Sequence, residues 1–506
     1  MEYIIVQAGG KGTRLGYLTQ NKPKALVPID NLPMLFHLFR KYPDKRYVII
    51  ADYKKEVMRE YLASFADVKY QVVDASGTGT CSGVKQALNL IPEQKPFMLV
   101  WSDLILPNSF MLPKEYETDM IPEHDYVGLS ETFSCRWKFE NGVFDEERST
   151  ENGVAGFFLF TDKRKIADVP ESGELVRWIS EQGFDFKTIG LAGTREFGLL
   201  EEYEKLPQVK CRPFNRITVD GDILIKEPID SQGERLAKRE AAWYEKARLL
   251  RIPELPEIFE TKPLKMEFIK GRNIYDCNFD YKTKKSILDA LVGALKSLHE
   301  SEKVAVDSFS LEEAYFNKTM DRLAKIQDLI PFARDKEIIV NGRKCRNVYF
   351  YKRELQKKID SLKCDCEEFA FIHGDCTFSN LMVRDDNSPV LIDPRGYFGF
   401  SELFGDVRYD WAKLYYSIVG NYDQFNLKRF RLEIGDTPED GINLKIISNH
   451  WEDLEKDFFD ITGANKDEIK LLHAVIWLSL TTYAWQDYDS ICGAFYNGLY
   501  YLEEVL

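Results

Sequence analysis

The sequence contains Phe371-Ile-His-Gly-Asp-Cys-Thr-Phe-Ser-Asn380, followed by Val390-Leu-Ile-Asp-Pro-Arg-Gly396. The first stretch predicts a tight loop that carries Asp375 and Asn380, and the second predicts a short apolar strand that ends at Asp393. Phosphoryl transfer from ATP needs such a set: a carboxylate that orients and deprotonates a hydroxyl, and an amide with a second carboxylate that hold Mg²⁺ against the phosphates. The alternative is a β-hairpin whose polar residues cap turns, and the combination of all three groups disfavours it.

This spacing resembles the catalytic and metal-binding loops of the aminoglycoside phosphotransferase and choline kinase family, a small-molecule branch of the protein-kinase fold. The resemblance implies that Asp375 is the catalytic base and that Asn380 and Asp393 bind Mg²⁺. Upstream, Lys226 ends the second strand of a predicted hairpin, and Glu240 lies on the predicted helix that follows. A strand lysine and a helix glutamate form the ion pair that positions ATP phosphates in kinase folds. We therefore expect Lys226 and Glu240 in the nucleotide site.

Other segments of the C-terminal half fit the same resemblance. Residues 266–271 suit the hinge strand between two lobes, with backbone groups available for adenine. Residues 285–302 predict an amphipathic helix with its leucines on one face. Residues 318–362 predict a long, charged helical region that is interrupted near Pro331 and Gly342.

The segment Gly405-Asp-Val-Arg-Tyr-Asp-Trp-Ala-Lys-Leu414 resembles the start of the family helix that buttresses the catalytic loop. The resemblance places Asp406 in support of that loop and Asp410 towards the acceptor. We interpret His299 as a packed or capping residue rather than a base. The aromatic side chains of the C-terminal tail are interpreted mainly as core, although a cage for a quaternary ammonium is the competing reading. Arg395 is an unsuitable neighbour for a cationic acceptor, which favours a neutral or anionic one.

The N-terminal end combines Tyr3-Ile-Ile-Val-Gln-Ala-Gly-Gly-Lys-Gly-Thr-Arg-Leu15 with Asn21-Lys-Pro-Lys-Ala-Leu-Val-Pro-Ile29. The pattern predicts a buried strand that runs into a glycine-rich turn, where backbone N–H groups can approach a triphosphate because Cβ atoms are missing. Arg14 and Lys24 supply cations that offset charge in the transition state. Both halves together resemble the signature of the sugar-phosphate nucleotidylyltransferases, G-G-x-G-T-R-L followed by P-K-x-L. The turn residues that we expect at the nucleotide are Gly9, Gly10, Gly12 and Thr13.

The following residues alternate between predicted strands and helices up to Asp103. Such alternation gives a mainly parallel sheet with ligands at the carboxyl ends of its strands. In the resembled family a G-T-x-x-G segment contacts the base, and here that segment begins at Gly77 and includes Gly79. The family aspartate that ends the next long strand binds Mg²⁺, and Asp103 occupies that position. A helix N-cap is the alternative role for Asp103.

One position departs from the family pattern at a point that matters for catalysis. The family usually carries a second metal-binding aspartate in a D-x-G-T segment, and the matching residue here is Leu191, which cannot bind a cation. Asp185 or Glu196 could substitute, a single aspartate could suffice, or the domain could bind without catalysing. The family's N-A-G turn, which contacts the sugar, reads Val154-Ala-Gly here.

The bulk properties of the 506-residue chain limit the classes of function. A formal charge of −14 disfavours a nucleic-acid surface, which needs a basic face, but leaves nucleotide binding open. No apolar run has membrane-spanning length and no signal peptide precedes Tyr3, so we expect a cytoplasmic protein without membrane insertion. Nine cysteines without paired spacing fit reduced thiols, and six histidines form no ligand cluster, so the expected metal is Mg²⁺ on oxygen ligands.

The length exceeds that of one ordinary core, so we expect several domains and an α/β fold overall. Residues 1–206 predict a Rossmann-like nucleotidyltransferase domain with a mainly parallel sheet. Residues 207–211 predict a linker, because a helix stops there and two prolines bracket a short extended piece. A bilobal α+β kinase-like domain follows, with its N-lobe at 212–271 and its C-lobe at 272–506.

Together these motifs predict a bifunctional enzyme. Its kinase domain phosphorylates a hydroxyl of a small sugar, polyol or amino-alcohol with ATP. Its nucleotidyltransferase domain then transfers the nucleotidyl group of a second NTP to that phosphate and releases pyrophosphate. CTP or UTP is favoured as the second NTP. The expected product is an NDP-activated sugar or polyol for capsule or surface-glycan synthesis, since both halves resemble enzymes of such pathways. The sequence sets neither the acceptor, nor the base of the second NTP, nor the oligomeric state.

Two other functions stay open. One is a choline kinase joined to a phosphocholine cytidylyltransferase. The other is a small-molecule kinase that is regulated by an inactive, nucleotide-sugar-sensing N-terminal domain, and Leu191 at the expected aspartate position supports it. Protein kinase activity is disfavoured, because no activation segment with an A-P-E-like element follows Asp393.

Overall fold

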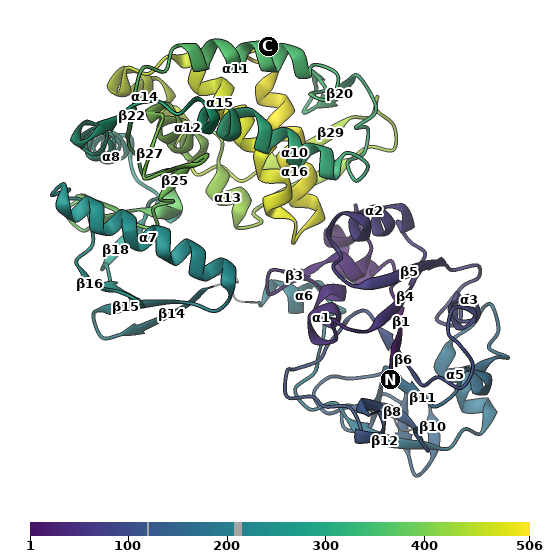
Figure 1. Cartoon of the computed structure of the whole chain (residues 1–506). Coiled ribbons are helices and arrows are strands. Elements are labelled where there is room, and N and C mark those ends of the chain that lie inside the picture. Colours follow the sequence, from purple (N-terminus) through teal and green to yellow (C-terminus); the bar gives the residue numbers. More distant parts are fainter. Residues whose placement is uncertain (119–120, 207–214) are drawn as a thin grey trace. The chain divides into compact units, whose positions relative to one another are not determined.

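The computed structural model of the chain contains two compact units (Figure 1). It describes residues 1–118, 121–206 and 215–506. Among the described residues, the first unit comprises residues up to 206 together with 486–488, and the second comprises residues 215–485 and 489–506. The predicted linker at 207–211 lies outside the described residues. Among the helices of the described part, none combines the length and the apolar character needed to cross a membrane.

Parallel strands form the centre of the first unit. They are β1 (Tyr3–Gln7), β4 (Arg46–Ala51), β5 (Lys69–Asp74) and β6 (Phe97–Trp101). Their order is β6-β1-β4-β5, and every neighbouring pair among them is parallel. Residues 4–6 of β1 are apolar at every position because both faces of this strand are buried. The helices that the alternation predicted are α2 (Lys55–Phe65) and α3 (Val84–Asn89), and a further helix, α1 (Met34–Lys41), precedes β4.

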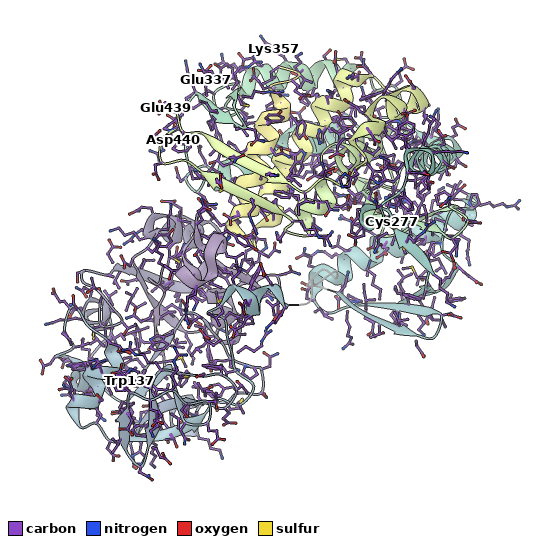
Figure 2. The ribbon with its side chains drawn as sticks, turned by 180° about the vertical axis from the view of Figure 1, so that it is seen from behind. Trp137, Cys277, Glu337, Lys357, Glu439 and Asp440 are labelled. Atoms are coloured by element: carbon purple, nitrogen blue, oxygen red, sulfur yellow. The ribbon has the colours of Figure 1, made fainter. Side chains whose placement is uncertain are left out.

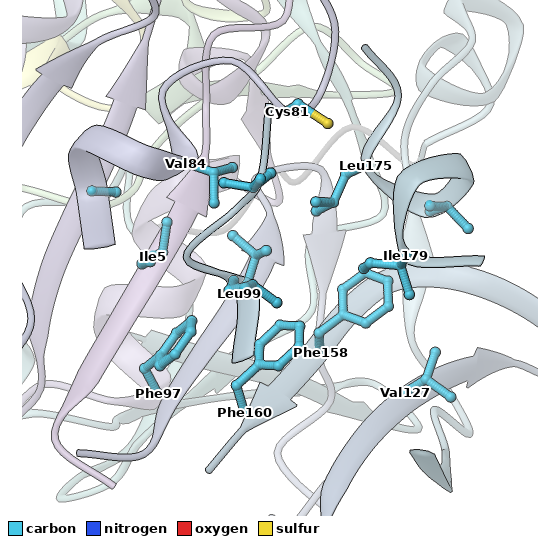
Figure 3. Close-up of a cluster of buried hydrophobic side chains, with 14 of the residues drawn as sticks. Ile5, Cys81, Val84, Phe97, Leu99, Val127, Phe158, Phe160, Leu175 and Ile179 are labelled. Carbon is cyan, nitrogen blue, oxygen red and sulfur yellow. The ribbon is translucent and has the colours of Figure 1, made fainter. Parts of the chain in front are cut away.

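The sheet continues beyond β6 through antiparallel strands. β11 (Gly153–Phe160) runs antiparallel to β6, and β8 (Asp125–Ser130) pairs with β11. β12 (Phe186–Gly190) then pairs in parallel with β8. The remaining elements of the unit include β7 (Leu104–Ile105), β9 (Lys138–Glu140), β10 (Val143–Asp145), α5 (Leu175–Gln182), β13 (Arg195–Glu196) and α6 (Leu200–Glu204). The core on one face of the sheet includes Ile5, Phe97, Leu99, Phe158, Phe160 and Ile179 (Figure 3).

The carboxyl ends of β1 and β6 lie side by side. Gln7 is paired with Trp101, and the backbone N–H of Ser102 donates to the carbonyl of Gln7 at 3.2 Å. The glycine-rich turn after β1 and Asp103 after β6 therefore reach the same edge of the sheet. This is the edge at which parallel α/β sheets bind ligands.

The second unit begins with an antiparallel sheet and a long helix. The strands are β14 (Asn215–Asp220), β15 (Ile223–Pro228), β16 (Ile258–Thr261) and β17 (Leu264–Glu267), in the order β14-β15-β17-β16. Helix α7 (Ser231–Leu249) lies between β15 and β16 in the chain. It begins at Asp230, whose side chain caps the helix by accepting from the backbone N–H of Gly233 at 2.7 Å. Lys226 lies within β15, two residues before the strand ends.

Helices dominate the rest of the second unit. They are α8 (Tyr281–Ser301), α9 (Ser308–Glu312), α10 (Lys318–Ile326), α11 (Lys352–Cys364), α12 (Val407–Ile418), α13 (Tyr422–Asn426), α14 (Glu455–Thr462), α15 (Lys466–Leu480) and α16 (Tyr488–Leu502). Short strands carry the predicted catalytic segments: β18 (Gly271–Asn273), β22 (Phe369–Phe371), β23 (Leu381–Arg384) and β24 (Pro389–Leu391). The apolar face predicted for α8 is buried, and so are Trp411, Tyr415, Tyr416, Phe495 and Tyr496 of the aromatic tail.

The prediction of a long helical region over residues 318–362 is wrong in its middle part. A β-hairpin of β20 (Glu337–Val340) and β21 (Arg343–Arg346) separates α10 from α11. Its two turn residues, Asn341 and Gly342, both have positive φ, at 48° and 76°. An Asn-Gly pair between strands favours this kind of tight turn, which here overrides the helical tendency of the charged flanks. The hairpin is extended by β29 (Ile442–Ile446) and β28 (Phe430–Ile434).

Candidate active sites

The second unit brings together one cation and two carboxylates from distant parts of the chain. The Lys226 ammonium on β15 lies 2.8 Å from Glu240 Oε2 on α7 and 2.5 Å from Asp393 Oδ1, which follows β24. Burial alone would lower the pKa of Lys226, but the charges of Asp393 and Glu240 outweigh it and raise that pKa. Burial raises the pKa of Glu240 against the opposing charge of Lys226. The lysine is therefore held as a cation at neutral pH.

The backbone holds Asp393 next to the loop that carries Asn380. Asp393 adopts a left-handed conformation, with φ at 52°, which is uncommon outside glycine and is found at functional sites. The backbone N–H of Ile392 donates to the carbonyl of Asn380 at 3.0 Å. His373 Nε2 lies 3.0 Å from the carbonyl oxygen of Ile392. These contacts connect the predicted apolar strand to the predicted loop.

Asp375 lies on the same loop and contacts two side chains. Asn380 Nδ2 donates to the backbone carbonyl of Asp375 at 2.8 Å and to its Oδ2 at 3.2 Å. The Lys413 ammonium on α12 lies 2.9 Å from Asp375 Oδ1. Since the amide nitrogen of Asn380 faces Asp375, the side-chain oxygen of Asn380 and the carboxylate of Asp393 provide oxygen ligands of the kind that Mg²⁺ prefers. The residues present thus fit a magnesium site beside the carboxylate that the resemblance predicts to be the base.

Asp410 supports this loop, which differs from the expected arrangement. Its buried carboxylate accepts from the backbone N–H groups of His373 at 2.9 Å and Gly374 at 2.7 Å, and it contacts His299 Nε2 at 2.9 Å. Burial alone would raise the pKa of Asp410, but these partners hold it below its ordinary value. Both oxygens of Asp410 therefore contact groups of the protein, and a role towards the acceptor stays a prediction.

Asp406, which we expected to support the loop, instead caps α12. It accepts from the backbone N–H of Arg408 at 3.0 Å and forms an ion pair with that side chain at 2.7 Å. The helix cap fixes the start of α12, and Asp410 then reaches the loop one turn further along. His299 packs against Trp411 with ring centroids 5.0 Å apart, as expected for a packed residue.

In the first unit, Lys24 connects the glycine-rich turn to Asp103. Its ammonium lies 2.5 Å from Asp103 Oδ2. Gly12 has φ at 64°, and a Cβ there would lie only 3.0 Å from the Lys24 Cβ. A Cβ at Gly9 would lie 2.8 Å from the Asp52 side chain, whereas a Cβ at Gly10 would meet nothing within 4 Å. Close packing therefore requires glycine at 9 and 12, and the turn is open at Gly10.

The Gly77 and Gly79 segment packs tightly against another loop of the unit. A Cβ at Gly77 would lie 2.0 Å from the carbonyl oxygen of Glu171, and one at Gly79 would lie 2.4 Å from that of Gly173. The backbone N–H of Gly77 donates to Ser82 Oγ at 2.8 Å. These contacts explain the glycines by packing, and their contact with a nucleotide stays a prediction.

Leu191 is fully buried, and Glu196 is an acidic residue close to Lys24 and Asp103. Glu196 on β13 is paired with Leu104, the residue after Asp103, and its Oε1 lies 3.6 Å from the Lys24 ammonium. Burial and the charge of Asp103 raise the pKa of Glu196. Asp103 Oδ1 is buried and has no hydrogen-bond partner among the described residues. The carboxylates of Asp103 and Glu196, together with this buried Asp103 oxygen, fit a cation that also binds substrate phosphates.

The two other candidates near this site take different places. Arg14 lies near Glu196. Both side chains border Gly198, since a Cβ built on that glycine would lie 3.0 Å from Arg14 Nη2 and 2.5 Å from Glu196 Oε1. Asp185 is exposed and directly precedes β12, whereas Leu191 follows the carboxyl end of that strand. A strand of this length separates its two ends by about 17 Å, so Asp185 does not replace the missing aspartate. Across the described residues, no group of three His, Cys, Asp or Glu side chains is arranged to hold a metal ion by itself.

Sequence reasoning missed Lys413, and the structure shows why it matters. The residue lies three positions after Asp410 on α12, so both side chains project towards the same loop. Helical periodicity counted from Asp410 in the predicted supporting helix could have identified Lys413. Lys318 and Arg322 on α10 were also missed, because the sequence does not reveal which helix face meets the loop.

Comparison with known proteins gives two separate family matches. Residues 3–116 match the family described as nucleotidyl transferase, and residues 216–434 match the phosphotransferase enzyme family. These matches confirm the predicted combination of two families and the predicted fold class.

Individual relatives match shorter stretches. The bifunctional protein GlmU of Methanococcus maripaludis (strain C7) is 32% identical over 108 residues, which are 21% of this chain and 25% of that protein. The UTP--glucose-1-phosphate uridylyltransferase AglF of Haloferax volcanii is 42% identical over 60 residues, 11% of this chain and 25% of that protein. The chain thus spans about a quarter of the length of these curated relatives. The crystal structure of HddC from Yersinia pseudotuberculosis matches with 20% identity and a TM-score of 0.34, covering 40% of this chain and 97% of that one.

Proposed function

Because the chain joins a nucleotidyl transferase domain to a kinase-type phosphotransferase domain, we propose that it acts on one small molecule twice. The phosphotransferase domain phosphorylates a hydroxyl of a small sugar, polyol or amino-alcohol with ATP. The nucleotidyl transferase domain then joins the new phosphate to a nucleotide. The observation that carries the first activity is the position of the Lys226 ammonium between Glu240 and Asp393.

In the first step the acceptor hydroxyl attacks the γ-phosphorus of ATP, and ADP leaves with the bridging oxygen. Asp375 accepts the hydroxyl proton, and Lys226 binds the ATP phosphates in the orientation that Glu240 fixes. Asn380 and Asp393 would hold Mg²⁺, which neutralises phosphate charge when bound. Asp410 keeps the loop of Asp375 in place through the hydrogen bonds that it accepts from the backbone N–H groups of His373 and Gly374.

In the second step an oxygen of the new phosphate ester attacks the α-phosphorus of a second NTP, and pyrophosphate leaves. Backbone N–H groups of Gly9, Gly10, Gly12 and Thr13 would bind the triphosphate. Arg14 and Lys24 offset the charge that develops during this attack. Asp103 and Glu196 would hold the Mg²⁺ of this site. The relative AglF is named a UTP--glucose-1-phosphate uridylyltransferase, which supports UTP as the second nucleotide, with CTP as the alternative.

The product would be an NDP-activated sugar or polyol of the kind that serves capsule or surface-glycan synthesis. The rival with a choline acceptor is less well supported, because Lys413 pairs with Asp375 and Arg395 is hydrogen-bonded through its backbone to His373 of the same loop. The rival with a sensor domain rests on Leu191, and the carboxylate of Glu196 beside Lys24 weakens that argument.

Two coupled assays test the proposal. Full-length protein is incubated with Mg²⁺, ATP and a panel of small alcohols, and ADP release is measured. Each phosphorylated candidate is then supplied with each NTP, and pyrophosphate is measured. Release of both products supports the bifunctional enzyme. ADP release without pyrophosphate from any combination would instead support the sensor domain.

A further inference from the structure

We propose that the acceptor of the phosphotransferase domain carries an anionic group, a carboxylate or a phosphate, that is bound by Lys318, Arg322 and Arg395. This inference rests on the proposed kinase function and names the chemical class of its acceptor. The three cations belong to two segments that meet beside the loop of Asp375, and none of them is explained by the phosphoryl-transfer step itself.

Arg395 belongs to the segment that directly follows Asp393. Its backbone N–H donates to the carbonyl of His373 at 2.9 Å, and its Cβ lies 2.9 Å from the position that a Cβ on Gly374 would take. The backbone and Cβ of Arg395 therefore lie against the two residues that precede Asp375. Its guanidinium donates to the hydroxyls of Tyr409 at 2.9 Å and Tyr397 at 2.8 Å. Both partners are hydroxyl groups rather than carboxylates, and Arg395 forms no ion pair within the described ranges.

Lys318 and Arg322 approach from α10. They lie four residues apart, so they share one face of the helix. A π-helical turn at Glu313–Asn317 leads into α10, and its Tyr315 ring lies 6.3 Å from the ring of Tyr409. Single π-helical turns inside helices are frequent at functional sites. Tyr409 thus connects this helix to the guanidinium of Arg395.

Neither helix cation forms an ion pair with an acidic side chain among the described residues, and the acidic charge that acts on Lys318 is that of Glu313, in the turn before α10. Arg322 donates to the backbone carbonyl of Ser479 and to its Oγ, which are neutral groups. The side chain of Lys318 is half-buried and forms neither an ion pair nor a hydrogen bond with any residue that the structure describes. Burial and the neighbouring charges of Arg395, Arg322 and Lys413 lower the pKa of Lys318. The same causes, burial first and Arg395 next, lower the pKa of Arg322.

Partly buried cations that outnumber the nearby carboxylates are unfavourable in a folded protein, because burial removes their solvation and their charges repel one another. An anionic ligand supplies the missing charge. Lys413 already pairs with Asp375 at 2.9 Å, so the remaining positive charge is available to the acceptor. An anion bound by Lys318, Arg322 and Arg395 would direct a hydroxyl of the same molecule towards Asp375. The same cations would repel choline.

Inorganic sulfate is the first probe, because it tests the anion site without knowledge of the acceptor. Full-length protein saturated with Mg²⁺ and a non-hydrolysable ATP analogue is titrated with sulfate by calorimetry. Lys318→Met should weaken sulfate binding about tenfold, since one charge-assisted contact is lost, and Lys318→Arg should retain it. Lys357→Met is the matched control, because Lys357 is exposed on α11 (Figure 2). Equal sulfate affinity in wild type and a folded Lys318→Met variant would overturn the inference.

The second probe is a set of small acceptors: glycerate, glycerol 3-phosphate, glycerol and choline. ADP release should be at least about tenfold faster with glycerate or glycerol 3-phosphate than with the other two, and the faster of these anions identifies carboxylate or phosphate. Faster turnover of glycerol or choline would overturn the inference while leaving the kinase function intact. Sulfate binding that depends on Lys318, without ADP release from any alcohol, would support the anion site and count against the kinase function.

Discussion

The Glu196 carboxylate lies 3.6 Å from the Lys24 ammonium, on the strand that pairs with the residue next to Asp103. This relationship gives the nucleotidyl transferase domain a second acidic group although Leu191 occupies the expected aspartate position. The two carboxylates reach the site from different strands, β13 and the end of β6. A cation between them would still be held from two sides, with substrate phosphates as its other ligands.

Glu196→Gln should therefore reduce nucleotidyl transfer strongly. The amide keeps the size of the side chain but removes the charge that binds Mg²⁺, so we expect a loss of roughly 100-fold in pyrophosphate release and a weaker apparent Mg²⁺ affinity. ADP release by the other domain should not change. Asp185→Asn is the matched control, because Asp185 is exposed at the far end of β12. An unchanged Mg²⁺ dependence in Glu196→Gln would argue that Asp103 suffices alone.

The pH dependence of that Mg²⁺ affinity follows from the environment of Glu196. Burial and Asp103 raise its pKa, and only the ionised carboxylate binds a cation. As the pH falls through the raised pKa, protonation should weaken Mg²⁺ binding at a higher pH than for an exposed glutamate. The test compares Mg²⁺ titrations of pyrophosphate release from about pH 8 to about pH 5.5. Glu196→Gln should lose this component, and identical pH profiles in both proteins would contradict the assignment.

Asp375→Asn should separate the two activities. The amide cannot accept the hydroxyl proton, so ATP-dependent phosphorylation should fall by about 10²- to 10⁴-fold. Nucleotidyl transfer to a supplied phosphate ester should continue, because its candidate residues belong to the other unit. The measurement is ADP release in one assay and pyrophosphate release in the other. Loss of both activities in a well-folded variant would be incompatible with two independent sites.

The sequence predicted those site residues that are brought together by one short motif or by two neighbouring elements. Asp375, Asn380 and Asp393 occur in a fixed order on one loop and one strand, so their meeting depends only on local structure. Lys226 and Glu240 could be proposed because a strand and the next helix are neighbours in space. The structure places Lys226 with Glu240 and Asp393, as the kinase resemblance implied.

Roles that depend on how a helix is rotated or on strand direction could not be predicted. The choice between Asp185 and Glu196 needed the direction of β12, and the roles of Asp406 and Asp410 needed the cap of α12. The missed β-hairpin is different, because the Asn341-Gly342 pair directly after the apolar residues 338–340 was a visible signal. The charged residues around it were given too much weight.

Asp423 offers a test of stability in the phosphotransferase domain. This aspartate lies on α13 and is buried, and it accepts from the backbone N–H of Ser379 in the catalytic loop at 2.8 Å. Burial raises the pKa of Asp423 to about 6, whereas the unfolded chain has a value of about 3.9. Between these values the folded state binds more protons than the unfolded state, so this group lowers stability as the pH rises through that window.

Asp423→Asn should remove this pH-dependent loss of stability, while the amide oxygen still accepts a hydrogen bond from the backbone N–H of Ser379. At about pH 7 the variant should be more stable than wild type by up to about 3 kcal/mol, which is the free energy of a shift of about two pKa units. The difference should shrink as the pH falls towards about 4, and thermal unfolding of both proteins across this range measures it. Asp385→Asn is the control, because Asp385 is exposed in the same unit. A stability difference that stays constant with pH would mean that Asp423 acts through packing rather than through its charge.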